Sequence, residues 1–548
     1  MAQLEGFLTR YATTLSPTIL IGSLVGLWVV YNVFVALRDP LRSVPGPFLA
    51  RFTRLWWLEV DSRGRILRSI GNTVLNLHLA EFFAVAFELT LPGPIVRIAP
   101  NYYSIDDADA IKTIYGHGTN FVKGKWYIAS NNPKNKHPDL FTDLNPESHA
   151  INRRNVASLY SMTSLVAMEP NAVACAEILV QKFTEFAKNH SAINLQVWLQ
   201  YYAFDTIALI TLSKRFGFLD TGKDNGNMIA ALHSYLLYLS KVGVYHEWHY
   251  FLNWILSMLP NGGMHYMGTF MQQQVLEGQR QKSKRILEKD ESKPTDDFLT
   301  KLLRMHALQP DKFPMESVFS TCGTNIGAGS DTTSVSLAGI LYHLMKAPAV
   351  MEKLRQELDQ AIEERGSNDI LSFQEAQKLP YLQAVIKEGL RCHPATGLPM
   401  VRVVPKGGAH IAGKYFPEKT EVGVNSWVAH SNKKIFGPDA EEFRPERWLE
   451  SPERAAEMTR YNLTFGAGSR TCIGKNISLL EISILIPELV RKFDFTLVDP
   501  NRPLEIENAW FVKQKNLDCY WDIMDEYIKF RGCKFAETDL GEVDALYI

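Results

Sequence analysis

The 548-residue sequence has few cysteines, and no two of them lie close together in the chain. It contains no CxxC, and its six cysteines are scattered along the chain: Cys175, Cys322, Cys392, Cys472, Cys519 and Cys533. Disulfide-rich secreted domains and zinc sites of short spacing both need closer, repeated cysteines. The pattern therefore argues against both classes and favours a reducing compartment.

The sequence also lacks an excess of charge of either sign. Its 58 Lys and Arg residues are offset by 59 Asp and Glu residues, which leaves a formal net charge of -1. Nucleic-acid-binding domains usually carry a basic surplus, so we expect no nucleic acid partner.

Long uncharged runs are rare here, and the main one lies near the N-terminus. Residues 11–37 contain no charged side chain, and Arg38 and Arg42 follow directly. About 20 apolar residues span a bilayer as one helix, and basic residues tend to stay on the cytosolic side. We expect residues 15–37 to be a single-pass anchor, 1–14 to be lumenal and 38–50 to be a Pro-rich hinge. The alternative is an ordinary buried helix.

One glycine-rich stretch holds a single thiol. Phe465, Gly466, Gly468, Cys472 and Gly474 lie in a loop that precedes an apolar, helix-like run. Glycines permit unusual backbone angles and close approach of a ligand, and a helix N-terminus stabilises a thiolate. A lone thiolate in an apolar setting suits haem iron. Phosphate binding, zinc binding and a plain buried cysteine are the alternatives.

A second stretch is unusual because small and hydroxyl residues interrupt a long helical pattern over residues 314–346. It includes Ala328, Gly329, Asp331 and Thr332. Glycine weakens a helix interior by about 1 kcal/mol relative to alanine, so a flat ligand packed on this face would explain the absent side chains. A kinked helix rich in Ser and Thr is the alternative.

The first stretch resembles the haem-binding loop FxxGxRxCxG of the cytochrome P450 family through Phe465, Gly468, Arg470, Cys472 and Gly474. The second is similar to the distal-helix motif of that family. The resemblance implies haem b (iron protoporphyrin IX) with the Cys472 thiolate as axial ligand and metal-binding residue, lined also by Gly466, Ala328 and Gly329. It implies that Asp331 and Thr332 relay protons during catalysis.

Further basic residues match positions where the family binds the haem propionates. His149 and Arg153 are four apart, so they share one face of a helix. The family often has Trp-x-x-x-Arg there, and this chain has His in place of Trp. Arg402, in a predicted strand, and Arg470 complete the set that the resemblance implies.

Glu388 and Arg391 are three apart on an amphipathic helical pattern, and Arg447 follows in Phe-Arg-Pro-Glu-Arg-Trp. An exposed pair of this kind would contribute only about 0.2–0.5 kcal/mol. The three residues resemble the buried Glu-Arg-Arg network of the family, which implies a structural role in holding the haem loop.

The resemblance implies a mainly α-helical cytochrome P450 fold, a large helical domain with a small β-rich subdomain. Residues 51–528 would form this catalytic domain, and 529–548 a C-terminal tail of unknown role. The segment 66–92 departs from the family, and an amphipathic or buried helix is our interpretation. Strand-like pieces at 409–415 and 420–424 predict a small sheet.

The similarity is strongest to the fungal pisatin demethylase-like and benzoate 4-monooxygenase-like microsomal branch. It implies a haem-thiolate monooxygenase of the endoplasmic reticulum membrane, cytosolic in its catalytic domain, acting on a small hydrophobic substrate in secondary metabolite biosynthesis. The chain has no dinucleotide fingerprint, so NADPH would act through a partner, NADPH-cytochrome P450 reductase, with cytochrome b5 as a second donor. A haem isomerase or dehydratase of the same fold, or a non-enzymatic haem-binding protein, is the alternative.

Overall fold

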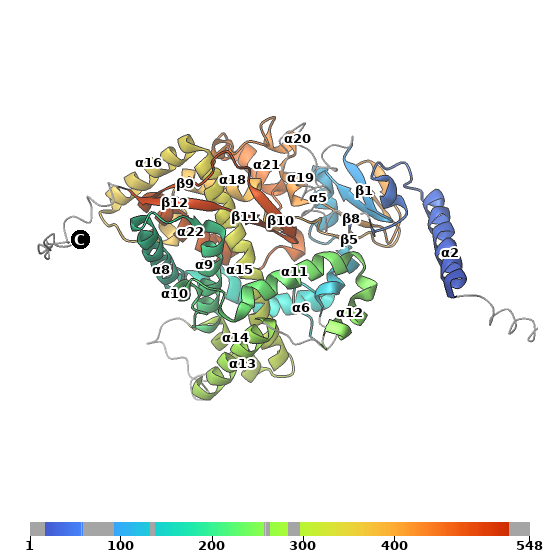
Figure 1. The fold of residues 1–548 in the computed structure, drawn as a ribbon, viewed down its shortest axis with the longest axis horizontal. Helices are drawn as coiled ribbons and strands as arrows, with labels where there is room; N and C mark the ends of the chain where they lie inside the picture. The colour runs from blue at the N-terminus through green and yellow to red at the C-terminus, as the bar shows by residue number, and fades with distance from the viewer. Residues whose placement is uncertain are drawn as a thin grey trace, which may run out of the picture.

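The computed structural model describes residues 17–55, 57, 93–131, 137–256, 258, 263–282 and 296–524, which are mainly helical (Figure 1). The expectations for 1–14, 66–92 and 529–548 lie outside these residues. The α-helices of the described residues are α2 (Pro17–Arg38), α5 (Ala108–Tyr115), α6 (Pro146–Val156), α7 (Met162–Val166), α8 (Glu169–Lys188), α9 (Leu195–Leu212), α10 (Phe218–Thr221), α11 (Met228–Val244), α12 (His249–Leu256), α13 (Gly263–Lys282), α14 (Phe298–Leu308), α15 (Met315–Lys346), α16 (Pro348–Arg365), α17 (Phe373–Ala376), α18 (Pro380–Cys392), α19 (Ser426–His430), α20 (Lys433–Phe436), α21 (Pro452–Tyr461) and α22 (Lys475–Lys492).

Helix α2 stands apart from the rest of the described chain (Figure 1). Its segment Ile19–Arg38 is 20 residues long and is not buried against other parts of the protein. At about 1.5 Å per residue this length matches the hydrocarbon thickness of a bilayer. In the described part of the chain, α2 is the one helix long and apolar enough to cross a membrane. The predicted anchor is therefore a single helix that ends at Arg38.

Helix α15 runs through the centre of the molecule (Figure 1). Its 32 residues begin after Pro314, as the sequence pattern predicts, and end at Lys346. It packs most extensively against α9, and also against α18 and α22. Helix α9 is buried around nearly its whole circumference, which explains its lack of an amphipathic pattern. This central packing fixes α15 opposite the start of α22.

The strands of the described residues form small sheets at the sides of the helical body. Their bounds are β1 (Ile95–Ala99), β2 (Tyr102–Ile105), β3 (Val122–Lys123), β4 (Ile193–Asn194), β5 (Arg402–Val403), β6 (Ala409–Ile411), β7 (Lys414–Phe416), β8 (Glu421–Gly423), β9 (Phe493–Leu497), β10 (Glu505–Ala509), β11 (Phe511–Lys515) and β12 (Asp518–Ile523). The largest sheet has the order β1-β2-β8-β5-β3, in which β2 and β8 are parallel and the other pairs are antiparallel.

The remaining strands form separate units. They are the hairpins β6-β7 and β10-β11 and the antiparallel sheet β4-β12-β9. The segments 409–415 and 420–424 therefore belong to different sheets, because β8 pairs with β2 and β5 instead of with its neighbours in sequence.

The chain that follows α2 is bound to the body of the protein. Arg97, in β1, forms a 2.6 Å ion pair with Asp39, and its guanidinium also donates to the Leu41 carbonyl. A Cβ on Gly46 would lie 2.4 Å from the Arg97 carbonyl oxygen, so only glycine fits this approach. Arg54 is held by Glu247 at 2.7 Å. Residues 39–54 are thus packed against β1 and the end of α11.

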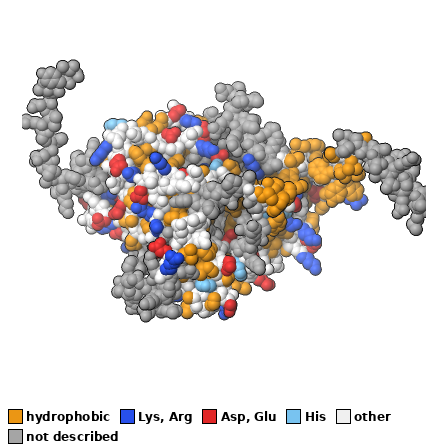
Figure 2. All heavy atoms as spheres, turned by 60° about the horizontal axis from the view of Figure 1, so that its bottom comes forward, with side chains coloured by type: hydrophobic (Ala, Val, Ile, Leu, Met, Phe, Trp, Pro, Cys, Tyr) orange, Lys and Arg blue, Asp and Glu red, His pale blue; other side chains and the backbone are white. Residues whose placement is uncertain are grey.

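Apolar side chains remain exposed close to this attachment. Phe48 is 73% exposed, and α12 exposes Tyr250, Phe251 and Trp254. Figure 2 shows hydrophobic side chains gathered on α2 and on the neighbouring part of the protein surface. Such a patch is typical of a surface that meets a partner or a membrane.

Candidate functional site

A cavity lies between α15 and the loop before α22. The loop contributes Phe465, Gly466, Arg470, Cys472 and Gly474 to its wall. Facing them, α15 contributes Ala328, Gly329 and Thr332, while other segments add His149, Arg153 and Arg402. The structure thus brings residues more than 300 positions apart in the sequence into one site, as expected for a ligand-binding centre.

The cysteine loop is a compact turn closed by backbone hydrogen bonds. The Cys472 N–H donates to the Phe465 carbonyl at 2.8 Å, and the Thr471 hydroxyl donates to the same carbonyl at 3.0 Å. Helix α22 begins at Lys475, so Cys472 lies just before its first turn. Its thiol is open to the cavity and enclosed by protein beyond it.

Two glycines of the loop have backbone conformations that other residues rarely adopt. Gly466 and Gly468 have φ of 67° and 66°. A Cβ on Gly468 would lie 1.6 Å from the Tyr115 carbonyl oxygen, so α5 packs directly on the loop. Gly474 was also expected to use the backbone freedom of glycine, but its φ of -80° is one that any residue adopts. It ends the loop as the residue before α22.

Two opposing effects act on the pKa of the Cys472 thiol. Burial is the larger effect and raises the pKa of this thiol. Hydrogen bonds from the backbone N–H groups of Gly474 and Lys475 and the charge of Arg153 act to lower the same pKa. The predicted stabilisation of a thiolate by the helix start is therefore present, but burial outweighs it in the protein alone.

On the opposite wall, α15 approaches the cavity with small side chains. Ala328 is exposed to the cavity, and the Thr332 hydroxyl donates to the Ala328 carbonyl at 2.8 Å. A Cβ on Gly329 would lie 3.1 Å from the Ile207 side chain of α9. Gly329 therefore allows close packing of α9 as well as access to the cavity, a reason that the sequence pattern did not reveal.

Asp331 lies beside Thr332 in sequence but not in the cavity wall. Its side chain is fully buried and pairs with the Lys513 ammonium at 2.9 Å. Gln200, from α9, donates a second hydrogen bond to the carboxylate. Lys513 and Gln200 are partners that sequence reasoning missed, because they are distant in the chain.

Four cationic side chains line the cavity: Lys123, Arg153, Arg402 and Arg470. None of the described residues that line it is Asp or Glu. Burial and the neighbouring cations lower the pKa of Arg470 to about 10 and that of Lys123 well below its ordinary value. Asp143 acts on both of these cations from outside the lining, but burial and the other cations outweigh it. Since buried cations are costly unless they are neutralised, this set fits a ligand that carries negative charge.

Lys123 was not predicted from the sequence. It lies in β3, pairs in register with Arg402 of β5, and its ammonium donates to the Phe141 carbonyl. Arg470 donates to the Asp143 carbonyl at 2.6 Å, but its Nη2 is buried without a hydrogen-bond partner among the described residues. Burial, Arg470 and the other cations lower the pKa of His149 to about 3, so His149 is neutral beside them.

Glu388, Arg391 and Arg447 form a buried network next to the cysteine loop. Arg391 binds both carboxylate oxygens of Glu388, at 2.9 and 2.8 Å, and Arg447 binds one at 2.8 Å. The Trp448 indole donates to the same carboxylate at 2.9 Å. Burial acts to raise the pKa of Glu388, but hydrogen bonds and charge from the arginines outweigh it and lower that pKa. The three side chains are at most 2% exposed.

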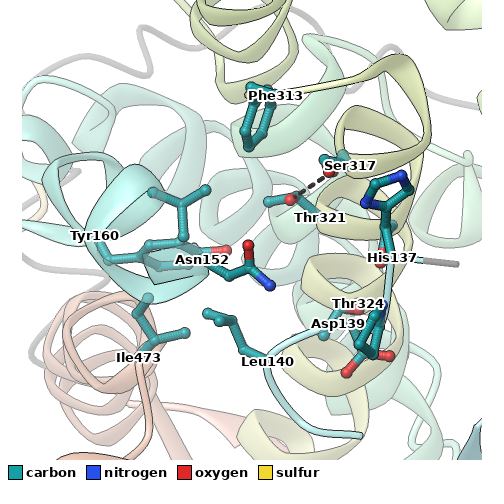
Figure 3. Close-up of a pocket in the computed structure, with 13 residues that line it drawn as sticks. His137, Asp139, Leu140, Asn152, Tyr160, Phe313, Ser317, Thr321, Thr324 and Ile473 are labelled. Carbon is teal, nitrogen blue, oxygen red and sulfur yellow. Dashed lines mark hydrogen bonds between the residues drawn. The ribbon is translucent and has the colours of Figure 1, made fainter. Parts of the chain in front are cut away.

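A smaller pocket adjoins the cavity and shares Leu140, Tyr160, Thr324 and Ile473 with it. Figure 3 shows Asn152 and Tyr160 on one side, facing Thr321 and Thr324 of α15. The Thr321 hydroxyl donates a hydrogen bond to the Ser317 carbonyl at 2.7 Å. The pocket is therefore a side extension of the same site, with a partly polar wall.

The fold and the site together define a mainly helical protein with one cysteine in an otherwise basic and apolar cavity. The sequence profile described as Cytochrome P450 matches residues 78–519. The chain therefore belongs to the cytochrome P450 family, whose members hold haem through a cysteine thiolate.

Within that family the chain is similar to fungal enzymes. It is 39% identical over 488 residues to pisatin demethylase of Fusarium vanettenii, covering 89% of this chain and 91% of the relative. It is 34% identical over 500 residues to the cytochrome P450 monooxygenase gsfF of Penicillium aethiopicum, covering 90% and 95%. The predicted pisatin demethylase-like membership and the monooxygenase class, an oxidoreductase, are confirmed.

Proposed function

We propose that this chain inserts one oxygen atom from O₂ into a small apolar substrate, by hydroxylation, epoxidation or demethylation. Haem b would be bound with the Cys472 sulfur as its axial ligand. Electrons would come from NADPH through a separate NADPH-cytochrome P450 reductase, with cytochrome b5 as an additional donor. This proposal builds on the family membership and on the chemistry of the cavity.

The observation that carries the proposal is a cysteine and four cations around one cavity without acidic lining among its described residues. Haem b has two propionates, and Arg470 Nη2, which has no hydrogen-bond partner in the described part of the chain, supports binding of a carboxylate. Arg153, Arg402, Arg470 and the neutral His149 would hold the propionates, and Lys123 joins this set. When bound, haem would supply activation of dioxygen, with the thiolate promoting O–O cleavage.

The chain's own residues would position substrate and protons. Thr332 presents a hydroxyl at the cavity and donates it to the Ala328 carbonyl. Asp331, the preceding residue of α15, lies buried beside it. Trp510, Phe511, Phe141 and other apolar groups line the cavity as well. These side chains favour an apolar substrate that is excluded from water. Ala328 and Gly329 would leave room for the flat face of haem.

The membrane assignment rests on α2 and the surface beside it. We infer a single-pass anchor with residues 1–14 lumenal, and a catalytic domain of residues 51–528 on the cytosolic side of the endoplasmic reticulum. The exposed Phe48 and the aromatic residues of α12 support contact of the domain with lipid. The similarity of the chain to fungal pisatin demethylase and to a fungal cytochrome P450 monooxygenase supports our proposal of a role in secondary metabolite biosynthesis.

The direct test compares metabolites of a strain that lacks the gene with those of its parent. We expect the deletion strain to accumulate a compound that lacks the oxygen, or retains the methyl group, of the compound that disappears. Membranes with the chain and reductase should convert the accumulated compound only when NADPH and O₂ are supplied. Conversion without NADPH, or by Cys472→Ala protein, would contradict the proposal.

A further inference from the structure

The carboxylate of Asp331 is enclosed by two side chains from other elements. Lys513 Nζ lies 2.9 Å from Asp331 Oδ2, and Gln200 donates to Asp331 Oδ1. The Asp331 side chain is 0% exposed and that of Lys513 is 11% exposed. The ion pair is therefore almost wholly shielded from solvent. It is the kind of buried pair in which loss of one partner is costly.

Lys513 belongs to the hairpin whose tip reaches the cavity. Trp510 is the tip between β10 and β11, and Phe511 is the first residue of β11. Both line the cavity, whereas Lys513 lies two residues further along the same strand. The next residue, Gln514, donates to the Val335 carbonyl of α15 at 2.9 Å. Strand β11 therefore contacts the cavity at one end and α15 at the other.

The hairpin tip is fixed in an unusual conformation. Trp510 has a φ of 75°, which is uncommon for a residue other than glycine and is a strained backbone conformation. Its indole stacks on Trp126 with ring centroids 4.4 Å apart, and its carbonyl accepts the Gly397 N–H at 3.0 Å. These contacts fix the position of β11, and with it the position of Lys513.

We propose that Lys513 is a positioning residue for Asp331. It holds the Asp331 carboxylate outside the cavity, next to Thr332 on the same helix. The Lys513 ammonium forms the ion pair with Asp331 Oδ2, and the Gln200 amide donates a hydrogen bond to Oδ1. Through β11, the same hairpin that lines the substrate cavity sets where this acid lies. This inference rests on the proposed monooxygenase function for its effect on turnover, but not for the ion pair itself.

The ion pair is tested by thermal unfolding of the haem-loaded protein. Lys513→Met leaves a buried carboxylate without a counter-ion, so we expect a lower unfolding temperature. Adding Asp331→Asn removes the unpaired charge and should restore at least part of the loss. Lys515→Met, on the same strand with a 42% exposed side chain paired to Glu507, is the matched control and should change the unfolding temperature less. A double variant that is less stable than Lys513→Met would overturn the proposal.

The positioning role is tested by NADPH oxidation with reductase present and no added substrate. Lys513→Met should lower the rate by about tenfold, less than the roughly 10²–10⁴-fold that a positioned proton-transfer group contributes, because Asp331 itself is still present. Lys513→Arg should retain most of the rate, and Lys513→Met should cause no further loss in an Asp331→Asn background. Equal rates for Lys513→Met and the parent, or independent losses in the double variant, would overturn it. Absence of NADPH oxidation in the parent would count against the proposed function and leave the unfolding test decisive for the pair.

Discussion

The imidazole of His430 connects the Glu-Arg-Arg network to the cysteine loop through Leu463. The Leu463 N–H donates to His430 Nε2 at 2.8 Å, so this nitrogen carries no proton. His430 Nδ1 then donates to the Arg391 carbonyl at 3.0 Å. Arg391 in turn donates to the His430 carbonyl at 2.8 Å. Leu463 lies two residues before Phe465, so the network and the loop share a hydrogen-bonded path.

This connection predicts a dependence of stability on pH. Burial and the Arg391 charge lower the pKa of His430 from an ordinary 6.5 to about 3. The unfolded chain binds a proton in this window and the folded protein does not, so stability falls as pH drops from about 6.5 towards 3, by up to ~1.4 kcal/mol per pH unit. His430→Gln should therefore show a shallower loss of unfolding temperature with acid. The exposed His410→Gln is the control, and equal slopes for the parent and His430→Gln would contradict the account.

Glu388 is expected to be essential for a stable haem loop. Glu388→Gln removes the charge that both arginines bind and leaves two buried guanidinium groups, at a cost of about 3–5 kcal/mol. Haem content per protein and denaturant unfolding measure the effect. The control is Glu457→Gln in an exposed pair with Arg454 at the same three-residue spacing, where the loss should stay below about 1 kcal/mol. Full haem content in Glu388→Gln would contradict the structural role.

Lys123 is expected to strengthen haem binding although it lies outside the sequence motifs. A hydrogen bond to a charged group contributes about 1.5–3 kcal/mol, so Lys123→Met should speed haem loss at least about tenfold. The measurement is the rate of haem transfer to an excess of apomyoglobin. Lys125→Met, two residues away and exposed, is the control. Unchanged transfer from Lys123→Met would exclude the lysine from the propionate set.

Gly468 is expected to tolerate no side chain. Its φ of 66° and the 1.6 Å approach of a Cβ to the Tyr115 carbonyl require the loop or α5 to move. Gly468→Ala should therefore yield protein with little haem. Gly327→Ala is the opposite case, since a Cβ there meets nothing within 4 Å and alanine favours a helix by about 1 kcal/mol. Haem content and yield should be lower for Gly468→Ala than for Gly327→Ala. Similar values for the two variants would contradict this prediction.

The sequence could predict the parts of the site that are local in the chain. The cysteine loop, helix α15, and the spacing of His149 and Arg153 on α6 depend on near neighbours or on specific motifs. Partners that depend on the fold were missed. Lys513 is far from Asp331 in sequence, and His430 of α19 meets the Leu463 N–H from a position 33 residues earlier in the chain.

The roles of single residues also depend on contacts that are distant in sequence. Gly329 is small partly because Ile207 of α9 packs on it, a contact that no local pattern records. Lys123 resembles any strand lysine until the register places it opposite Arg402. Tertiary contacts of this kind decide which of the plausible side chains meet in the cavity.

We propose that the Cys472 thiolate is the ligand of haem iron. The most direct measurement is the absorption spectrum of the reduced protein with carbon monoxide, for the parent and for Cys472→Ser. We expect the thiolate-type band for the parent, and its loss in Cys472→Ser at equal protein concentration. The absence of this band in the haem-loaded parent, or its persistence in Cys472→Ser, would contradict the account.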